Sequence, residues 1–144
     1  MGDAVRWMGP ELINPSEFDP KERHLTKKSD CYALGMVIYE VLSGQAPFSP
    51  YDGTAILFKV VDGEHPARPQ GGDGALFTAG LWRVLEFCWK PKPDDRPSLD
   101  IVLRCLRDGG KLPDQPQLGS STESWFGKFL RNRRHSKATA VKVP

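Results

Sequence analysis

The side chains that most often bind metals or act as nucleophiles are few and scattered in this sequence. The 144 residues include three cysteines and three histidines: Cys31, Cys88, Cys105, His24, His65 and His135. No two cysteines have the CxxC spacing of a zinc or redox motif, and each lies within an apolar stretch. The histidines lie far apart in unrelated contexts. The pattern therefore predicts buried, reduced thiols rather than disulfides, and it assigns no metal-binding residue.

A more informative charged group is the arginine of CWKPKPDDRPS, residues 88–98. An interior proline removes a hydrogen-bond donor and clashes with the preceding turn, so this proline-rich stretch cannot be one continuous helix. The guanidinium of Arg96 could hold a carboxylate through two parallel hydrogen bonds. Taken alone, the stretch favours a surface arginine beside Asp94 and Asp95, a contact that stabilises a fold by less than about 1 kcal/mol.

Phosphate chemistry has a weaker signal in the sequence. Gly71, Gly72 and Gly74 are closely spaced, but no strand pattern precedes them and no helix fingerprint follows. They are therefore predicted to be a spacer rather than a phosphate cradle. Lys27 and Lys28 lie at the start of an apolar helical pattern and are interpreted as solvated charges.

The elements that would position these groups are predicted to be helices. The strongest pattern covers residues 29–44, where Ser29 can cap the first turn and Gly44 can end the last. Between Tyr32 and Leu42 only Glu40 is charged. A helix that is apolar on all sides is typically surrounded by other elements, so this one is expected to be the central helix of a larger helical body.

Three shorter helices are expected at about residues 54–62, at residues 81–90 and from Pro97 to Gly109. The last of these has a predicted apolar stripe made of Leu99, Val102, Leu103 and Leu106. No β-strand pattern or internal repeat is convincing. The predicted fold class is therefore mainly α.

The charge of the chain is unevenly distributed. Residues 111–144 contain seven Lys or Arg against two acids, so residues 1–110 carry a net charge of −3 within a total of +2. Residues 111–124 are predicted to be a linker and residues 125–144 a basic, disordered tail. The segment WFGKFLRNRR could alternatively contact an anionic membrane or nucleic acid.

No apolar run is long enough to span a bilayer and no signal peptide is recognised, so a cytoplasmic protein is expected.

Four segments in order resemble the C-terminal lobe of a eukaryotic protein kinase domain. They are RWMGPEL at 6–12, KKSDCYALGMVIYEVLSGQAPF at 27–48, GEHPARP at 63–69 and CWKPKPDDRPS at 88–98. The resemblance covers about residues 5–107 and is greatest to tyrosine-kinase-like serine/threonine kinases. It implies residues 1–110 as a partial kinase domain, namely the helical C-lobe without the β-rich N-lobe and the catalytic loop.

The resemblance also implies roles for individual residues. Glu11 is expected to form a buried ion pair with Arg96, and Asp30 to anchor the catalytic loop through backbone hydrogen bonds. The substrate-side loop, beside the residue that follows the phosphoacceptor, would be Val5, Arg6, Trp7 and Met8. Ala4 matches neither the threonine typical of serine/threonine kinases nor the proline typical of tyrosine kinases, so the acceptor residue stays open.

The activity implied by the resemblance is ATP-dependent phosphorylation of proteins in signalling, with Mg²⁺. In this family the nucleotide and metal are held by GxGxxG, a strand lysine, HRD…N and DFG motifs. None occurs in these 144 residues, so no catalytic or cofactor-binding residue is assigned and the chain is expected to be catalytically incompetent alone. The alternative is a non-catalytic binding or scaffold module. Expected partners are protein substrates, other kinases or, through exposed apolar surface, a second copy.

Overall fold

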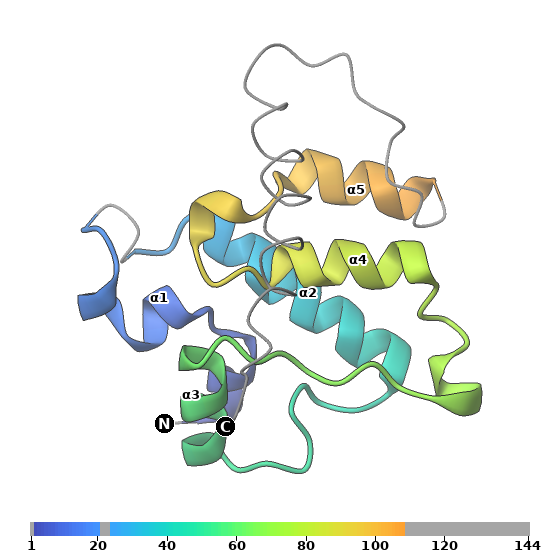
Figure 1. The fold of residues 1–144 in the computed structure, drawn as a ribbon, viewed down its shortest axis with the longest axis horizontal. Helices are drawn as coiled ribbons and strands as arrows, with labels where there is room; N and C mark the ends of the chain where they lie inside the picture. The colour runs from blue at the N-terminus through green and yellow to red at the C-terminus, as the bar shows by residue number, and fades with distance from the viewer. Residues whose placement is uncertain (1, 21–23, 109–144) are drawn as a thin grey trace, which may run out of the picture. The chain divides into compact units, whose positions relative to one another are not determined.

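The computed structural model describes residues 2–20 and 24–108 of the chain, and these residues form a helical body (Figure 1). The elements in chain order are η1 Asp3–Trp7, α1 Pro10–Ile13, η2 Pro15–Glu17, α2 Lys27–Ser43, α3 Gly53–Val61, η3 Gly71–Gly74, α4 Ala79–Cys88, η4 Pro93–Asp95 and α5 Leu99–Arg107. No strand occurs within this described part. The predicted mainly-α fold class is therefore confirmed.

The longest helix, α2, begins earlier than the sequence pattern predicts. Its N-cap is Thr26, whose hydroxyl accepts from the backbone N–H groups of Lys28 and Ser29. Ser29 is the N3 residue, and its own Oγ accepts from the Thr26 N–H at 2.6 Å. This reciprocal capping box satisfies donors that the helix itself leaves free, so the assignment of Ser29 as the cap is wrong. Gly44 ends the helix as predicted, with a φ of 70°.

The helices on either side of the arginine stretch also have polar caps. Thr78 Oγ1 accepts from the backbone N–H of Leu81 at the start of α4, and Ser98 Oγ accepts from that of Ile101 at the start of α5. Pro97 therefore precedes the cap of α5 rather than occupying its first helical position. The predicted end of this helix, Gly109–Gly110, lies outside the described residues.

The predicted apolar stripe of α5 is partly wrong. Val102 and Cys105 are buried, whereas Leu103 and Leu106 are exposed. Successive residues of a helix are rotated by about 100°, so a buried face centred on positions 102 and 105 turns the neighbouring positions 103 and 106 outward. Periodicity could not distinguish these leucines from the cysteine, because both sets have helical spacing.

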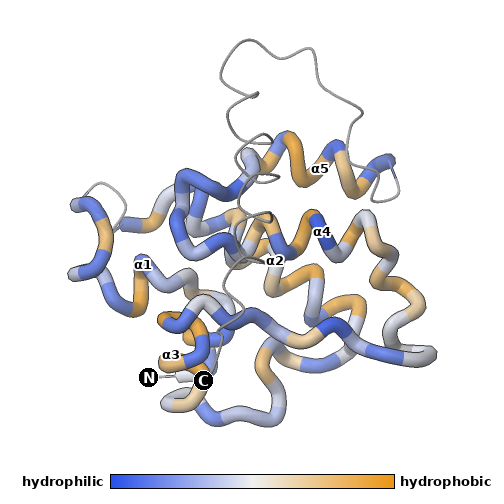
Figure 2. Tube along the Cα trace, viewed as in Figure 1, coloured by the Kyte–Doolittle hydropathy of each residue, from blue (hydrophilic) through white to orange (hydrophobic). Residues whose placement is uncertain are grey.

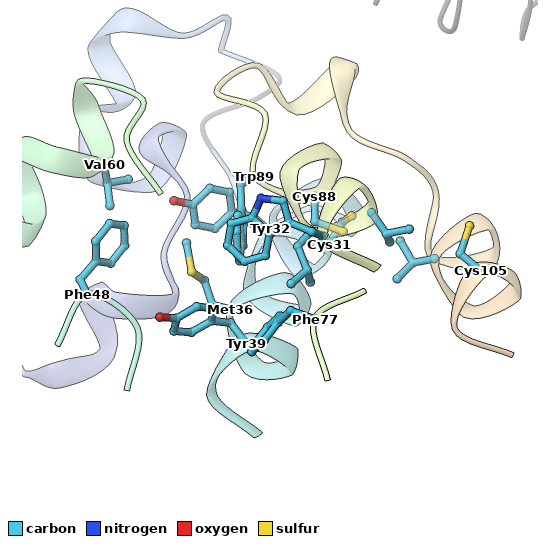
Figure 3. Close-up of a cluster of buried hydrophobic side chains, with 14 of the residues drawn as sticks. Cys31, Tyr32, Met36, Tyr39, Phe48, Val60, Phe77, Cys88, Trp89 and Cys105 are labelled. Carbon is cyan, nitrogen blue, oxygen red and sulfur yellow. The ribbon is translucent and has the colours of Figure 1, made fainter. Parts of the chain in front are cut away.

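The core lies where α4 packs against α2 on one side and α5 on the other. Its rings lie edge-on or tilted, with Tyr39 centred 5.7 Å from Phe77 and Trp82 centred 5.6 Å from Trp89. Figure 3 shows how Tyr39, Phe77 and Trp89 gather with other buried side chains between the helices. The indole N–H of Trp89 is buried and has no acceptor among the described residues.

One side of α2 is not covered by the described residues. Val41 is 73% exposed and Val37 is 44% exposed, while Leu34 and Ile38 on the same side are half-buried. The expectation that other elements surround this helix on all sides therefore does not hold within residues 2–20 and 24–108. We call Leu34, Val37, Ile38 and Val41 the α2 stripe. No helix among the described residues is long and apolar enough to cross a membrane.

The remaining short elements pack against this framework. η1 contacts both α2 and α3, and α1 contacts α3. α3 begins after Asp52, whose carboxylate accepts from the Ala55 N–H. Figure 2 shows α3 as one of the most apolar parts of the trace, yet Phe58 and Val61 on its outer side are exposed.

Candidate functional site

The candidate site centres on an ion pair between two side chains that are distant in sequence. Arg96 Nη1 donates to Glu11 Oε1 and Arg96 Nη2 to Glu11 Oε2, each at 2.7 Å. Both side chains have no exposed surface. Glu11 lies in the first turn of α1, which Pro10 begins, and Arg96 directly follows η4. Two parallel bonds of this kind fix the orientation of the groups as well as their separation.

The remaining N–H groups of the guanidinium are also satisfied. Nε donates to the carbonyl of Lys90 at 2.8 Å, Nη1 to that of Lys28 at 2.9 Å, and Nη2 to that of Pro91 at 3.2 Å. Together with the two bonds to Glu11, these contacts use all five donors of the side chain. The interpretation of Arg96 as a surface arginine is therefore wrong.

Two residues of α2 complete the surroundings of Arg96. The centre of its guanidinium lies 5.0 Å from the centre of the Tyr32 ring, within the range of a cation–π contact. Burial raises the pKa of the Tyr32 phenol, which keeps it neutral. The Lys28 ammonium donates to the backbone carbonyl of Arg96. The interpretation of Lys28 as a solvated charge is therefore wrong.

The four residues predicted to form the substrate-side loop lie in η1 and directly after it, and none of them is fully exposed: Val5, Arg6, Trp7 and Met8. Val5 is buried. Arg6 donates to the carbonyls of Pro47 and Tyr51 at 2.9 and 3.0 Å, which ties the loop to the α2–α3 connection. Met8 is half-buried, and its N–H donates to the Val5 carbonyl. These contacts fix the backbone of the loop.

A contact that the sequence interpretation missed links this loop to α2. The indole N–H of Trp7 donates to Glu40 Oε2 at 3.1 Å. The signal for Glu40 was its position as the lone charge between Tyr32 and Leu42 in an apolar helix. Such a charge needs a partner, but the sequence does not say which residue supplies it.

The structure does not bring Asp30 into this network of buried groups. Asp30 lies in the first turn of α2 and is exposed. It stands four residues before Leu34, so it extends the α2 stripe toward the start of the helix.

Other groups that could do chemistry are dispersed. Within the described residues, no three His, Cys, Asp or Glu side chains come together as possible metal ligands. All three cysteines are free thiols and are buried, as predicted. Gly71, Gly72 and Gly74 belong to the short η3 element between α3 and α4.

Comparison with known proteins places this helical arrangement in a class. A family model described as protein tyrosine and serine/threonine kinase matches residues 2–106. The match includes nearly all of the described residues, so the helices are those of a protein kinase C-terminal lobe. The chain belongs to the protein tyrosine and serine/threonine kinase family, and the predicted resemblance is confirmed.

Individual relatives agree with this family. The chain is 30% identical over 100 residues to mitogen-activated protein kinase kinase kinase 10 of Xenopus laevis, covering 69% of this chain and 9% of that protein. The human protein of the same name shows the same identity and coverage. The putative neurotrophin receptor LTRK 1 of Lymnaea stagnalis is 30% identical over 105 residues, covering 72% of this chain and 12% of the receptor. The chain thus spans about a tenth of the length of these curated relatives.

Proposed function

We propose that this chain is the substrate-side part of a protein kinase that acts in signalling. The complete domain would transfer the γ-phosphate of ATP to a serine, threonine or tyrosine hydroxyl of a protein, with Mg²⁺ as cofactor. The observation that carries the proposal is the support of η1 from two sides. Arg96 holds Glu11 just beyond the loop, and Glu40 holds Trp7 within it.

Phosphoryl transfer requires a substrate-binding surface with a fixed conformation, and these contacts provide it for η1. Positioning supplies a large part of the rate in such reactions, so the loop beside the acceptor must keep one conformation. Because Val5 is buried and Arg6 and Trp7 bond to other segments, an acceptor peptide would meet mainly the backbone of η1 and the exposed side chains of Asp3 and Ala4.

Titration of the isotopically labelled chain with serine-, threonine- and tyrosine-containing peptides tests this proposal. We expect amide chemical-shift changes concentrated at residues 3–8. In Glu40→Gln the hydrogen bond to Trp7 weakens, so these changes should shrink, whereas Glu86→Gln on α4 should preserve them. Peptide-induced changes confined to other segments, or equal changes in both variants, would contradict the assignment of η1 as the substrate-side surface.

The second part of the proposal is that these 144 residues do not transfer phosphate on their own. The sequence has no GxGxxG, HRD or DFG motif, and the described residues offer no cluster of metal ligands. These two observations support the second part of the proposal, and no catalytic step is assigned to these residues.

A phosphorylation assay decides this second part. The purified chain is incubated with Mg-ATP carrying a labelled γ-phosphate and with a generic protein substrate. We expect label incorporation equal to that of a reaction without the chain. Incorporation that rises in proportion to the chain, and that persists after further purification, would show that the chain catalyses phosphoryl transfer.

A second candidate function is a non-catalytic binding or scaffold module. The α2 stripe favours it, because Val37 and Val41 expose apolar side chains on a helix that otherwise contributes to the core. Such a surface can dock a protein substrate, another kinase or a second copy of the chain. Asp30 at its N-terminal end would, in a complete domain, anchor the catalytic loop.

The arrangement along the chain completes the proposal. Residues 1–110 form the partial kinase domain, 111–124 a linker and 125–144 a basic tail; residues 109–144 lie outside the described part. Contact of the tail with anionic membrane or nucleic acid is the weaker interpretation, and binding to vesicles or DNA that does not fall with rising salt would contradict it.

We place the protein in the cytoplasm, where the three thiols would stay reduced.

A further inference from the structure

Two buried thiols lie next to one another at the contact between α2 and α4. Cys31 is in the first part of α2 and Cys88 is the last residue of α4. Figure 3 shows their sulfur atoms close together at this contact. Cys105 lies apart from them on α5 in the same view. Neither Cys31 nor Cys88 has a role in the proposed kinase function.

The backbone of α2 explains why the thiols approach so closely. Gly35 follows Cys31 by one helical turn on the same side of α2. A Cβ atom at Gly35 would lie 2.9 Å from the Cβ of Cys88, so the end of α4 rests on the α2 backbone where a side chain is missing. Cys88 is thereby held over the surface that also presents Cys31.

The two thiols differ in their surroundings. Hydrogen bonding with the neighbouring Cys88 thiol lowers the pKa of Cys31, burial opposes this shift, and the positive charges of Arg96 and Lys28 add to the lowering. The pKa of Cys88 is raised, by the shared hydrogen bond and by burial. A thiolate is the reactive form of cysteine, so Cys31 is the better nucleophile of the two.

We propose that Cys31 and Cys88 form a reversible disulfide when the chain meets hydrogen peroxide, and that this bond joins α2 to the end of α4. The Cys31 thiolate attacks one peroxide oxygen, which breaks the O–O bond, releases hydroxide and leaves a sulfenic acid. The Cys88 sulfur then displaces the sulfenic hydroxyl, forming the S–S bond, and its proton leaves in water. Overall, two thiols and one peroxide give one disulfide and two waters.

The proposed disulfide would lie close to the backbone carbonyls that accept hydrogen bonds from Arg96. Lys90, two residues after Cys88, gives its carbonyl to Arg96 Nε, and Lys28, three residues before Cys31, gives its carbonyl to Nη1. A disulfide would therefore tie together two segments that hold the guanidinium. Because both thiols are fully buried, the reaction requires local opening at the end of α4, and it should be slower than oxidation of an exposed thiol.

The test uses the full chain treated with hydrogen peroxide, then denatured and reacted with N-ethylmaleimide. Intact mass should show alkylation of one of the three cysteines, and proteolysis should give a Cys31–Cys88 cross-linked peptide that dithiothreitol removes. The oxidised chain should also unfold at a higher temperature than the reduced one. Alkylation of all three cysteines, or a cross-link through Cys105 or to a second chain, would overturn the proposal.

Two variants make the result specific. Cys105→Ser keeps the pair and should form the same cross-link as the unmodified chain. Cys31→Val keeps an apolar side chain on α2 but removes the proposed nucleophile, so peroxide should no longer raise the unfolding temperature. If the cross-linked peptide fails to form in Cys105→Ser, the proposed disulfide is not the product of oxidation. If peroxide still raises the unfolding temperature of Cys31→Val, a bond between Cys31 and Cys88 does not cause that rise.

Discussion

Arg96 shows how much one side chain can hold in a small helical body. We expect Arg96→Met to lower the free energy of unfolding by about 3–5 kcal/mol, because Glu11 would keep a buried charge without its partner. Urea denaturation followed by circular dichroism measures the change. Arg83→Met, at an exposed position of α4, is the control and should cost less than about 0.5 kcal/mol. Equal effects of the two variants would show that the ion pair contributes little.

Tyr32 gives the fold a sensitivity to high pH. Burial raises the pKa of its phenol above the ordinary value of 10.0, so the unfolded chain loses this proton at a lower pH than the folded chain. The stabilisation is present below pH 10 and is lost as the pH rises beyond it. We expect the free energy of unfolding to fall above about pH 10, and to fall less steeply in Tyr32→Phe. Parallel pH profiles for the two chains would contradict this assignment.

At this scale the sequence could predict the Glu11–Arg96 partnership only through the family motifs around both residues. Without those motifs, the stretch around Arg96 favours a surface arginine, because Asp94 and Asp95 are its neighbours in sequence. The bonds from Trp7 to Glu40 and from Lys28 to Arg96 could not be predicted, since they join residues 33 and 68 positions apart. Such pairs depend on how the elements pack, which local patterns do not encode.

Gly35 sets the distance between the two helices that form most of the core. A Cβ atom there would lie 2.8 Å from Trp89 Nε1 and 2.9 Å from Cys88 Cβ. We expect Gly35→Ala to destabilise the chain by about 1–3 kcal/mol through overpacking, although alanine favours a helix over glycine by about 1 kcal/mol. Thermal unfolding measures the net change in stability.

Gly53, in the first turn of α3, is the matched control. Its nearest neighbour to an added Cβ is Val5 Cγ1 at 4.0 Å, so Gly53→Ala should leave the unfolding temperature unchanged or raise it. If Gly35→Ala is more stable than the unmodified chain, α4 can move away from α2 without a cost in stability.

The existence of the helices was easier to predict than their faces and ends. Apolar periodicity located all four of the longer helices. It misplaced the start of α2, because Thr26 and Ser29 are both good caps and the capping box uses both. On α5 the apolar pattern predicts Leu103 and Leu106 as core residues instead of Cys105, because leucine is the more hydrophobic residue. The pattern does not contain the position of α4, which determines the face that is buried.

The whole molecule is expected to associate through the α2 stripe, because Val37 and Val41 expose apolar surface there. Sedimentation velocity over a range of concentrations should show species larger than the monomer. The double variant Val37→Lys/Val41→Lys places two charges on the stripe, so the monomer should dominate at concentrations where the unmodified chain associates.

The control for association is Val61→Lys on the outer side of α3, another exposed apolar position. It should associate like the unmodified chain if the stripe is the contact surface. A chain that sediments as a monomer at all concentrations, with a sharp cooperative melt, would contradict the prediction.

The buried indole of Trp89 has an optical consequence for the molecule. Its N–H has no acceptor among the described residues, and its ring stacks on His65 with centroids 5.2 Å apart. An indole shielded from water fluoresces at shorter wavelength than a hydrated one. Trp89 is one of four tryptophans, and its contribution to the emission should move to longer wavelength when water enters the contact between α2 and α4.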